Sequence, residues 1–104
     1  MAFVQVGKFS EIKDGGVKGI MVGDKQIAIF RLGSDIFVLS DVCSHAGCIL
    51  SENHEIDGEE VQCACHGSRF NIRTGQVTNP PALEDLETYP VKVEGGQILV
   101  SIEE

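Results

Sequence analysis

All four cysteines and two of the three histidines lie in two short segments of the chain. The first segment reads CSHAGC at residues 43–48, and the second reads CACHGS at residues 63–68. They place Cys43 and His45 in a Cys-x-His pattern and, after seventeen residues, Cys63 and His66 in a Cys-x-x-His pattern. Thiolate sulfur and imidazole nitrogen are strong ligands for zinc and iron. The sequence therefore predicts one metal centre to which both segments contribute.

The rest of the chain has the pattern of short strands, which would hold these segments in place. Segments rich in Val, Ile, Leu and Phe alternate with turns that contain glycine. The predicted strands are Val17–Val22, Lys25–Leu32, Asp35–Leu39, Glu60–Cys63, Arg69–Ile72, Tyr89–Glu94 and Gln97–Ile102. Helical signals are limited to single turns at Ser10–Lys13 and Pro81–Glu87. The sequence thus predicts an all-β fold, an antiparallel sandwich or partial barrel.

Two-residue connections predict how the strands pair. Gly23-Asp24, Gly33-Ser34 and Gly95-Gly96 each join two predicted strands and favour tight hairpins. In the last hairpin the residues expected to face the core are Val91, Val93, Ile98, Val100 and Ile102. The segments without strand signals are Asp41–Glu59, Cys65–Ser68 and Thr74–Asp85. Binding loops are therefore expected in the region from about residue 41 to residue 85.

Length and charge narrow the class of protein. The 104 residues fit one domain spanning 1–104, with no internal repeat. The net charge of −8, from 16 acidic and 8 basic side chains, disfavours binding to nucleic acid or to an anionic membrane. Apolar runs are much shorter than the roughly 20 residues of a membrane span, so no membrane anchor is expected. The amino terminus lacks the pattern of a secretory signal, which predicts a cytoplasmic protein.

The two segments together resemble the motif of Rieske iron–sulfur proteins, in which two Cys and two His are divided between two glycine-bearing loops. The resemblance implies one [2Fe-2S] cluster in a Rieske fold, with a cluster-binding subdomain formed by the two loops. Cys43 and Cys63 would bind one iron as thiolates, and His45 and His66 would bind the other iron as neutral imidazoles. Neutral nitrogen ligands make that iron easier to reduce, so the added electron is expected on the histidine side.

Two other metal centres use similar residues. A Cys2His2 set also suits structural zinc, but paired Cys-x-His and Cys-x-x-His loops differ from the usual zinc-finger spacing. A plant-type ferredoxin shares the interval from Cys43 to Cys48, but its next cysteine would fall at Ser51. A structural zinc module that binds other proteins stays an alternative, and the colour of the purified protein would decide it.

Cys48 and Cys65 remain after the ligands are assigned. In Rieske proteins that oxidise quinols, cysteines at these motif positions form a disulfide between the two loops, so the resemblance implies a Cys48–Cys65 bond. Free thiols are the alternative, because disulfides are uncommon in the cytoplasm. The ferredoxins of oxygenase systems often lack this pair, and the chain departs from them at these two positions.

Other residues match positions that surround the cluster in the family. Gly47 and Gly67 would let the backbone approach the cluster and direct amide N–H groups at its sulfurs. Ser68 resembles a serine that donates to a cluster sulfide, whereas Phe70 replaces a tyrosine donor of the high-potential members and would pack in the core. Pro80-Pro81 resembles the loop that covers the cluster on a third side. Loss of one donor implies a potential within about −150 to +300 mV but away from the upper end.

The residues left over limit the function. A non-haem iron oxygenase site needs two histidines and a carboxylate, but only His54 is left, and it is interpreted as a solvated surface residue. The chain, including the run FNIRTG at residues 70–75, resembles the Rieske ferredoxin components of multicomponent aromatic-ring oxygenases. This resemblance implies a soluble one-electron carrier, not an enzyme, that passes electrons from a flavin-dependent reductase to a terminal oxygenase. The alternative is a Rieske subunit of a respiratory or nitrite reductase complex.

Overall fold

Three antiparallel β-sheets make up the described part of the protein, a computed structural model that describes residues 3–42, 49–64, 67–80 and 84–101. Their strand orders are β1-β11-β10, β2-β3-β4-β9 and β5-β6-β7-β8. The elements are β1 (Phe3–Lys8), the 3-10 helix η1 (Phe9–Glu11), β2 (Val17–Val22), β3 (Lys25–Leu32), β4 (Asp35–Ser40), β5 (His54–Asp57), β6 (Glu60–Cys63), β7 (Arg69–Asn71), β8 (Val77–Asn79), β9 (Thr88–Tyr89), β10 (Val91–Glu94) and β11 (Gln97–Ser101). The predicted all-β fold is confirmed.

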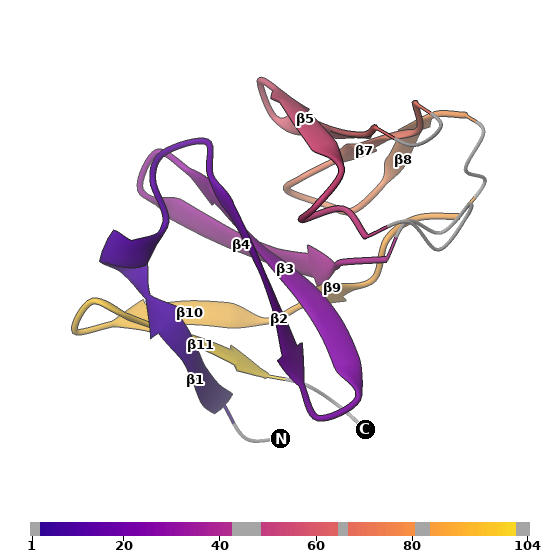
Figure 1. Ribbon diagram of the computed structural model, residues 1–104. Coiled ribbons are helices and arrows are strands. Elements are labelled where there is room, and N and C mark those ends of the chain that lie inside the picture. The colour runs from indigo at the N-terminus through magenta and orange to yellow at the C-terminus, as the bar shows by residue number, and fades with distance from the viewer. Residues whose placement is uncertain (1–2, 43–48, 65–66, 81–83, 102–104) are drawn as a thin grey trace.

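The first two sheets lie side by side, with β1 and β11 at the end of the molecule opposite to the third sheet (Figure 1). The predicted hairpins build these sheets. β2 and β3 pair as far as Val22 and Lys25, so Gly23-Asp24 forms their turn, and β3 and β4 are joined in the same way. Gly95 and Gly96, between β10 and β11, have φ angles of 58° and 79°, which residues with a Cβ rarely adopt.

Strand β3 is buried on both faces and separates two hydrophobic clusters. Ile27 and Ile29 pack toward the first sheet with Ile98 and Val100. Ala28 and Phe30 alternate with them and pack on the opposite side, in the cluster that extends to the third sheet. Because successive side chains of a strand point to opposite faces, this uninterrupted apolar run suits a strand in the middle of the molecule.

The segment predicted as one strand, Tyr89–Glu94, is divided at Pro90 into two strands of different sheets. β9 pairs with β4, whereas β10 pairs with β11. Proline has no N–H to donate to a ladder, so a continuous strand is unfavourable at that position. The core prediction for the last hairpin holds for Ile98 and Val100, but Val93 is 42% exposed because it lies at the end of an edge strand. Ile102 lies outside the described residues.

Strands β5 and β8 lie inside segments where no strand was expected. Both are short and mostly polar, and they add to β6 and β7, whose segments were predicted as strands. The predicted turn near Ser10 is present as η1, whereas residues 84–87, the described end of the other predicted turn, are not helical. No helix in the described ranges has the length and apolar character needed to cross a membrane.

Candidate metal centre

The second metal-binding segment begins at the end of β6 and forms the turn between β6 and β7. Cys63 N donates to Ser68 O at 2.7 Å, and Gly67 N donates to Cys63 O at 2.8 Å. Gly67 has a φ of 84°, in the left-handed region that lets the chain reverse within a few residues. Cys63 is a free cysteine with no exposed surface. The thiol is therefore placed at a rigid strand end beneath the turn.

The first metal-binding segment, residues 43–48, lies outside the described residues, but both of its ends are fixed. Val42 and Ile49 form an antiparallel bridge, and Leu50 N donates to Asp41 O at 2.7 Å. Asp41 N in turn donates to Gln26 O at 3.0 Å in the second sheet. The segment consequently begins and ends at one point beside the second sheet.

Asn53 and His54 connect the bases of the two segments, by which we mean the residues where each segment leaves the sheets: Ile49 and Leu50 after the first, and Cys63 and Ala64 at the start of the second. Ala64 N donates to Asn53 O at 3.0 Å, and Asn53 N donates to Ile49 O at 3.0 Å. His54 pairs with Cys63 in the β5–β6 ladder, and its Nδ1 lies 2.7 Å from Leu50 O. The contact of Nδ1 with a carbonyl oxygen requires the proton on Nδ1. The interpretation of His54 as a solvated surface residue is wrong, because it is half-buried and hydrogen-bonded between the two bases.

A buried carboxylate supports the base of the first segment, and sequence reasoning missed it. Asp41 is 2% exposed and accepts two hydrogen bonds of 2.6 Å, from the N–H and from the hydroxyl of Ser51. Burial raises the pKa of Asp41, and the two hydrogen bonds from Ser51 oppose that shift. The available signal was an acidic residue at the end of an apolar strand, directly before the motif.

Gly19 of β2 leaves the space that this carboxylate occupies. A Cβ at Gly19 would lie 2.2 Å from Ser51 Oγ and 2.6 Å from Asp41 Oδ2. Glycine is thus the residue that fits at this position of the strand. The glycine, the carboxylate and the serine form one packed unit under the first metal-binding segment.

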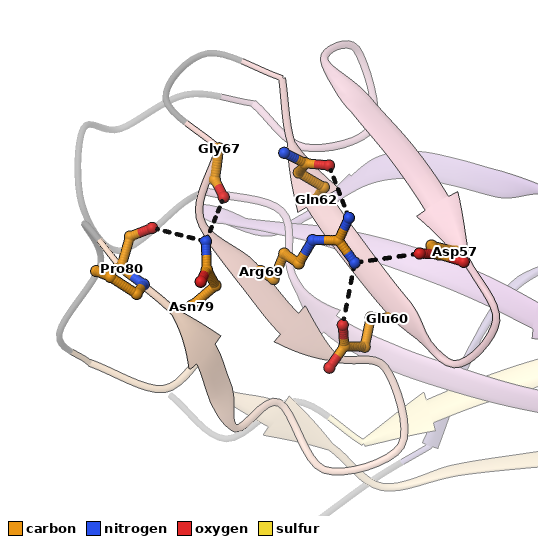
Figure 2. A network of polar contacts seen from close by, with 7 residues as sticks. All are labelled: Asp57, Glu60, Gln62, Gly67, Arg69, Asn79 and Pro80. Atoms are coloured by element: carbon orange, nitrogen blue, oxygen red, sulfur yellow. Dashed lines mark hydrogen bonds and ion pairs between the residues drawn. The ribbon is translucent and has the colours of Figure 1, made fainter.

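Arg69, the first residue of β7, connects the strands of the third sheet (Figure 2). Its guanidinium donates to Asp57 at 3.2 Å, to Glu60 at 3.3 Å and to Gln62 at 3.3 Å. The hydrogen bonds to Asp57 and Glu60 raise the pKa of Arg69 further above its already high value. The network holds the β5–β6–β7 sheet together directly behind the turn that follows Cys63.

The described residues include part of the predicted site. Cys63, Gly67, Ser68 and Pro80 lie around the β6–β7 turn and the end of β8, and Ser68 is fully buried. Phe70 is also fully buried, in the cluster with Val61, so its predicted packing role is confirmed. The predicted site residues that lie outside the described ranges are Cys43, His45, Gly47, Cys48, Cys65, His66 and Pro81.

The described geometry fits a sulfur-bound cluster. A buried free thiol, a left-handed glycine four residues later and a buried serine next to it are the features that a thiolate ligand with nearby hydrogen-bond donors requires. The family described as the Rieske [2Fe-2S] domain matches residues 2–90. The chain belongs to the Rieske [2Fe-2S] domain family. It carries one [2Fe-2S] cluster, and this match replaces the zinc interpretation of the motif.

Three similar proteins match this chain over nearly their whole length. The biphenyl dioxygenase ferredoxin subunit of Pseudomonas sp. (strain KKS102) is 34% identical, over 96% of this chain and 92% of that protein. The ferredoxin of carbazole 1,9a-dioxygenase from Nocardioides aromaticivorans IC177 has a TM-score of 0.93 at 30% identity, covering 99% of this chain and all of that one. A chain of a complex between reduced oxygenase and oxidised ferredoxin of carbazole 1,9a-dioxygenase has a TM-score of 0.89 at 29% identity, covering 95% of this chain and 92% of that one.

Proposed function

We propose that this Rieske protein is a ferredoxin, a one-electron carrier that accepts electrons from a flavin-dependent reductase and delivers them to a terminal oxygenase. The observation that carries the proposal is the match, over nearly the whole chain, to ferredoxin subunits of dioxygenase systems. The [2Fe-2S] cluster supplies reversible uptake of one electron. The protein itself is not an enzyme, because substrate oxidation belongs to the oxygenase.

The proposed ligands are Cys43 and Cys63 for one iron and His45 and His66 for the other. Support comes from the buried thiol of Cys63 and from the shared base of the two segments, which would bring both ends of the motif to one cluster. Hydrogen bonds near the sulfurs favour the reduced form by stabilising its added negative charge. Gly47, Gly67 and Ser68 are the proposed donors of this kind.

A disulfide between Cys48 and Cys65 is part of the same proposal. It would join the two ligand segments next to Ile49 and Ala64, the two residues whose backbones are hydrogen-bonded to Asn53. A cross-link between two segments restricts how far they separate when the cluster is absent. Titration of free thiols in the denatured, cluster-free protein measures it: two accessible thiols without reductant support the bond, and four contradict it.

The chain is proposed to fold as one domain over residues 1–104 and to act in the cytoplasm. Its net charge of −8 favours protein partners with a basic docking surface and disfavours nucleic acid. Attraction between opposite charges raises the rate of encounter and is screened by salt. Electron transfer to the partners should therefore slow as ionic strength rises.

A single-turnover experiment tests the proposal. The ferredoxin is reduced by a flavin-dependent reductase of a dioxygenase system and is then mixed with the oxidised terminal oxygenase of that system. The proposal predicts that the visible spectrum of the ferredoxin reoxidises while the oxygenase gains one electron per ferredoxin. A Thr78→Ala variant, altered at an exposed site, is the control and should transfer its electron as the native protein does. A ferredoxin that reduces a nitrite reductase but no oxygenase would contradict the proposal.

A further inference from the structure

Asn79, the last residue of β8, connects two segments that the strand ladder does not join. Its backbone pairs with Arg69, while its side chain extends past the start of β7 to the turn that follows Cys63. Nδ2 lies 3.3 Å from Gly67 O and 3.2 Å from Pro80 O (Figure 2). One carboxamide thus contacts the second ligand segment and the start of the proline-containing segment.

The chemistry of the two contacts defines the orientation of the amide. Gly67 O and Pro80 O are carbonyl oxygens, which accept hydrogen bonds and donate none. The NH2 group of Asn79 has two hydrogens, so it donates one to each carbonyl. Aspartate has the same shape but would place a carboxylate oxygen against the two carbonyls. The contact is consequently specific for a side chain with two donors on one nitrogen.

The backbone of Gly67 is hydrogen-bonded at both its N–H and its carbonyl oxygen. Its N–H donates to Cys63 O at 2.8 Å inside the turn, and its carbonyl accepts from Asn79 outside it. The proline-containing segment is also fixed at its far end, where Val77 N donates to Asp85 Oδ1 at 2.9 Å. Asn79 is therefore the side chain through which a displacement of one segment moves the other.

We propose that Asn79 is a positioning residue that fastens the proline-containing segment to the second ligand segment and so limits loss of the cluster. The inference rests on the proposed ligand set, because Gly67 directly follows His66. With the carboxamide in place, Gly67 and Pro80 move together and the turn after Cys63 stays closed. Without it, the two segments separate more readily and expose the cluster to water and to chelators.

Cluster release in matched variants tests the inference. Cluster-loaded native protein and the variants Asn79→Ala, Asn79→Asp, Asn79→Gln and Thr78→Ala receive an excess of an iron chelator, and loss of visible absorbance is followed. Loss of two solvent-exposed hydrogen bonds predicts release about two- to fivefold faster in Asn79→Ala. Asn79→Asp should release faster still, and Asn79→Gln, which retains the NH2 group, should recover part of the native rate. Thr78→Ala, at an exposed neighbour in β8, should behave as native.

Two further readouts separate positioning from general stability. The electron paramagnetic resonance spectrum of the reduced Asn79→Ala protein should broaden, because ligand geometry becomes more varied, while that of Thr78→Ala stays native. In Asn79→Ala, the free energy of unfolding in urea should change by less than the faster cluster release would require. Equal release rates in loaded native protein and Asn79→Ala, or release that rises only in step with unfolding, would overturn the inference alone. A native protein that binds no cluster would overturn both the proposed function and the inference about Asn79.

Discussion

Replacing Gly19 by alanine should disrupt the buried unit of Asp41 and Ser51 that supports the first ligand segment. The new Cβ would lie 2.2 Å from Ser51 Oγ, which is 1.2 Å short of the 3.4 Å at which ordinary contact begins. It would also lie 2.7 Å from Ser51 Cβ, so rotation of the hydroxyl alone does not relieve the clash. Either β2 moves away from the base of the segment or Ser51 moves away from Asp41.

The magnitude follows from the hydrogen bonds that must lengthen. Asp41 accepts two bonds of 2.6 Å from Ser51 and is 2% exposed, so water does not replace a lost donor without further opening. A hydrogen bond to a charged group contributes about 1.5–3 kcal/mol, and relaxation of the strand recovers part of that loss. We expect Gly19→Ala to lower the free energy of unfolding by about 2–4 kcal/mol and to reduce the fraction of chains that bind a cluster.

Urea unfolding followed by circular dichroism measures this change, with Gly7→Ala as the matched control. Gly7 also lies in a strand, but a Cβ there would approach only Glu11 Oε1 at 3.2 Å and Lys18 Nζ at 3.3 Å, the ends of flexible, solvent-accessible side chains. Its effect should stay within about 0.5 kcal/mol.

A double-variant cycle decides whether the clash with Ser51 is the cause. Ser51→Gly removes both atoms that the new Cβ would meet on that residue. The added effect of Gly19→Ala should then be smaller in the Ser51→Gly background, where the clash with Asp41 Oδ2 at 2.6 Å remains, than in the native protein. Equal destabilisation by Gly19→Ala and Gly7→Ala, or full additivity with Ser51→Gly, would refute the reasoning.

Three other changes have defined outcomes. Arg69→Met should lower the free energy of unfolding slightly, because its partly exposed guanidinium links two carboxylates of the third sheet, and chemical denaturation would measure the loss. Phe70→Tyr should raise the midpoint potential, because it restores the hydroxyl donor of the high-potential members, and protein-film voltammetry showing an unchanged or lower potential would contradict this. The Lys8 N–H and the Lys18 ammonium hold the pKa of Glu11 below its ordinary value of 4.5, so its stabilising effect is present above that value and is lost as pH falls through the lowered pKa. The stability difference between native protein and Glu11→Gln should accordingly shrink in acid, and a difference that is constant with pH would exclude this assignment.

Local sequence signals were sufficient to predict the central strands and their turns. The apolar run from Ile27 to Phe30 has no polar interruption, and the structure buries it on both faces. The two-residue turn at Gly95-Gly96 requires positive φ angles that glycine adopts easily. In both places the local preference and the tertiary environment favour the same conformation, so the prediction from sequence was reliable.

Features that depend on distant partners were not predictable in this way. β5 consists of His54, Glu55, Ile56 and Asp57, of which only Ile56 favours a strand, and it forms because the neighbouring β6 offers a free edge. Asp41 reads as an ordinary surface acid until Ser51, ten residues later, is placed beside it. The ligand segments were predicted because their residue types and spacing resemble the Rieske motif.

The most direct test of the account is pulsed electron paramagnetic resonance of the dithionite-reduced protein, combined with iron and acid-labile sulfide analysis. One [2Fe-2S] cluster held by Cys43, Cys63, His45 and His66 predicts equal amounts of iron and sulfide and couplings to two imidazole nitrogens. The couplings should fall to one nitrogen in His45→Cys or His66→Cys variants that retain a cluster. A reduced native protein without nitrogen couplings, or a colourless protein that contains zinc and no sulfide, would contradict the account.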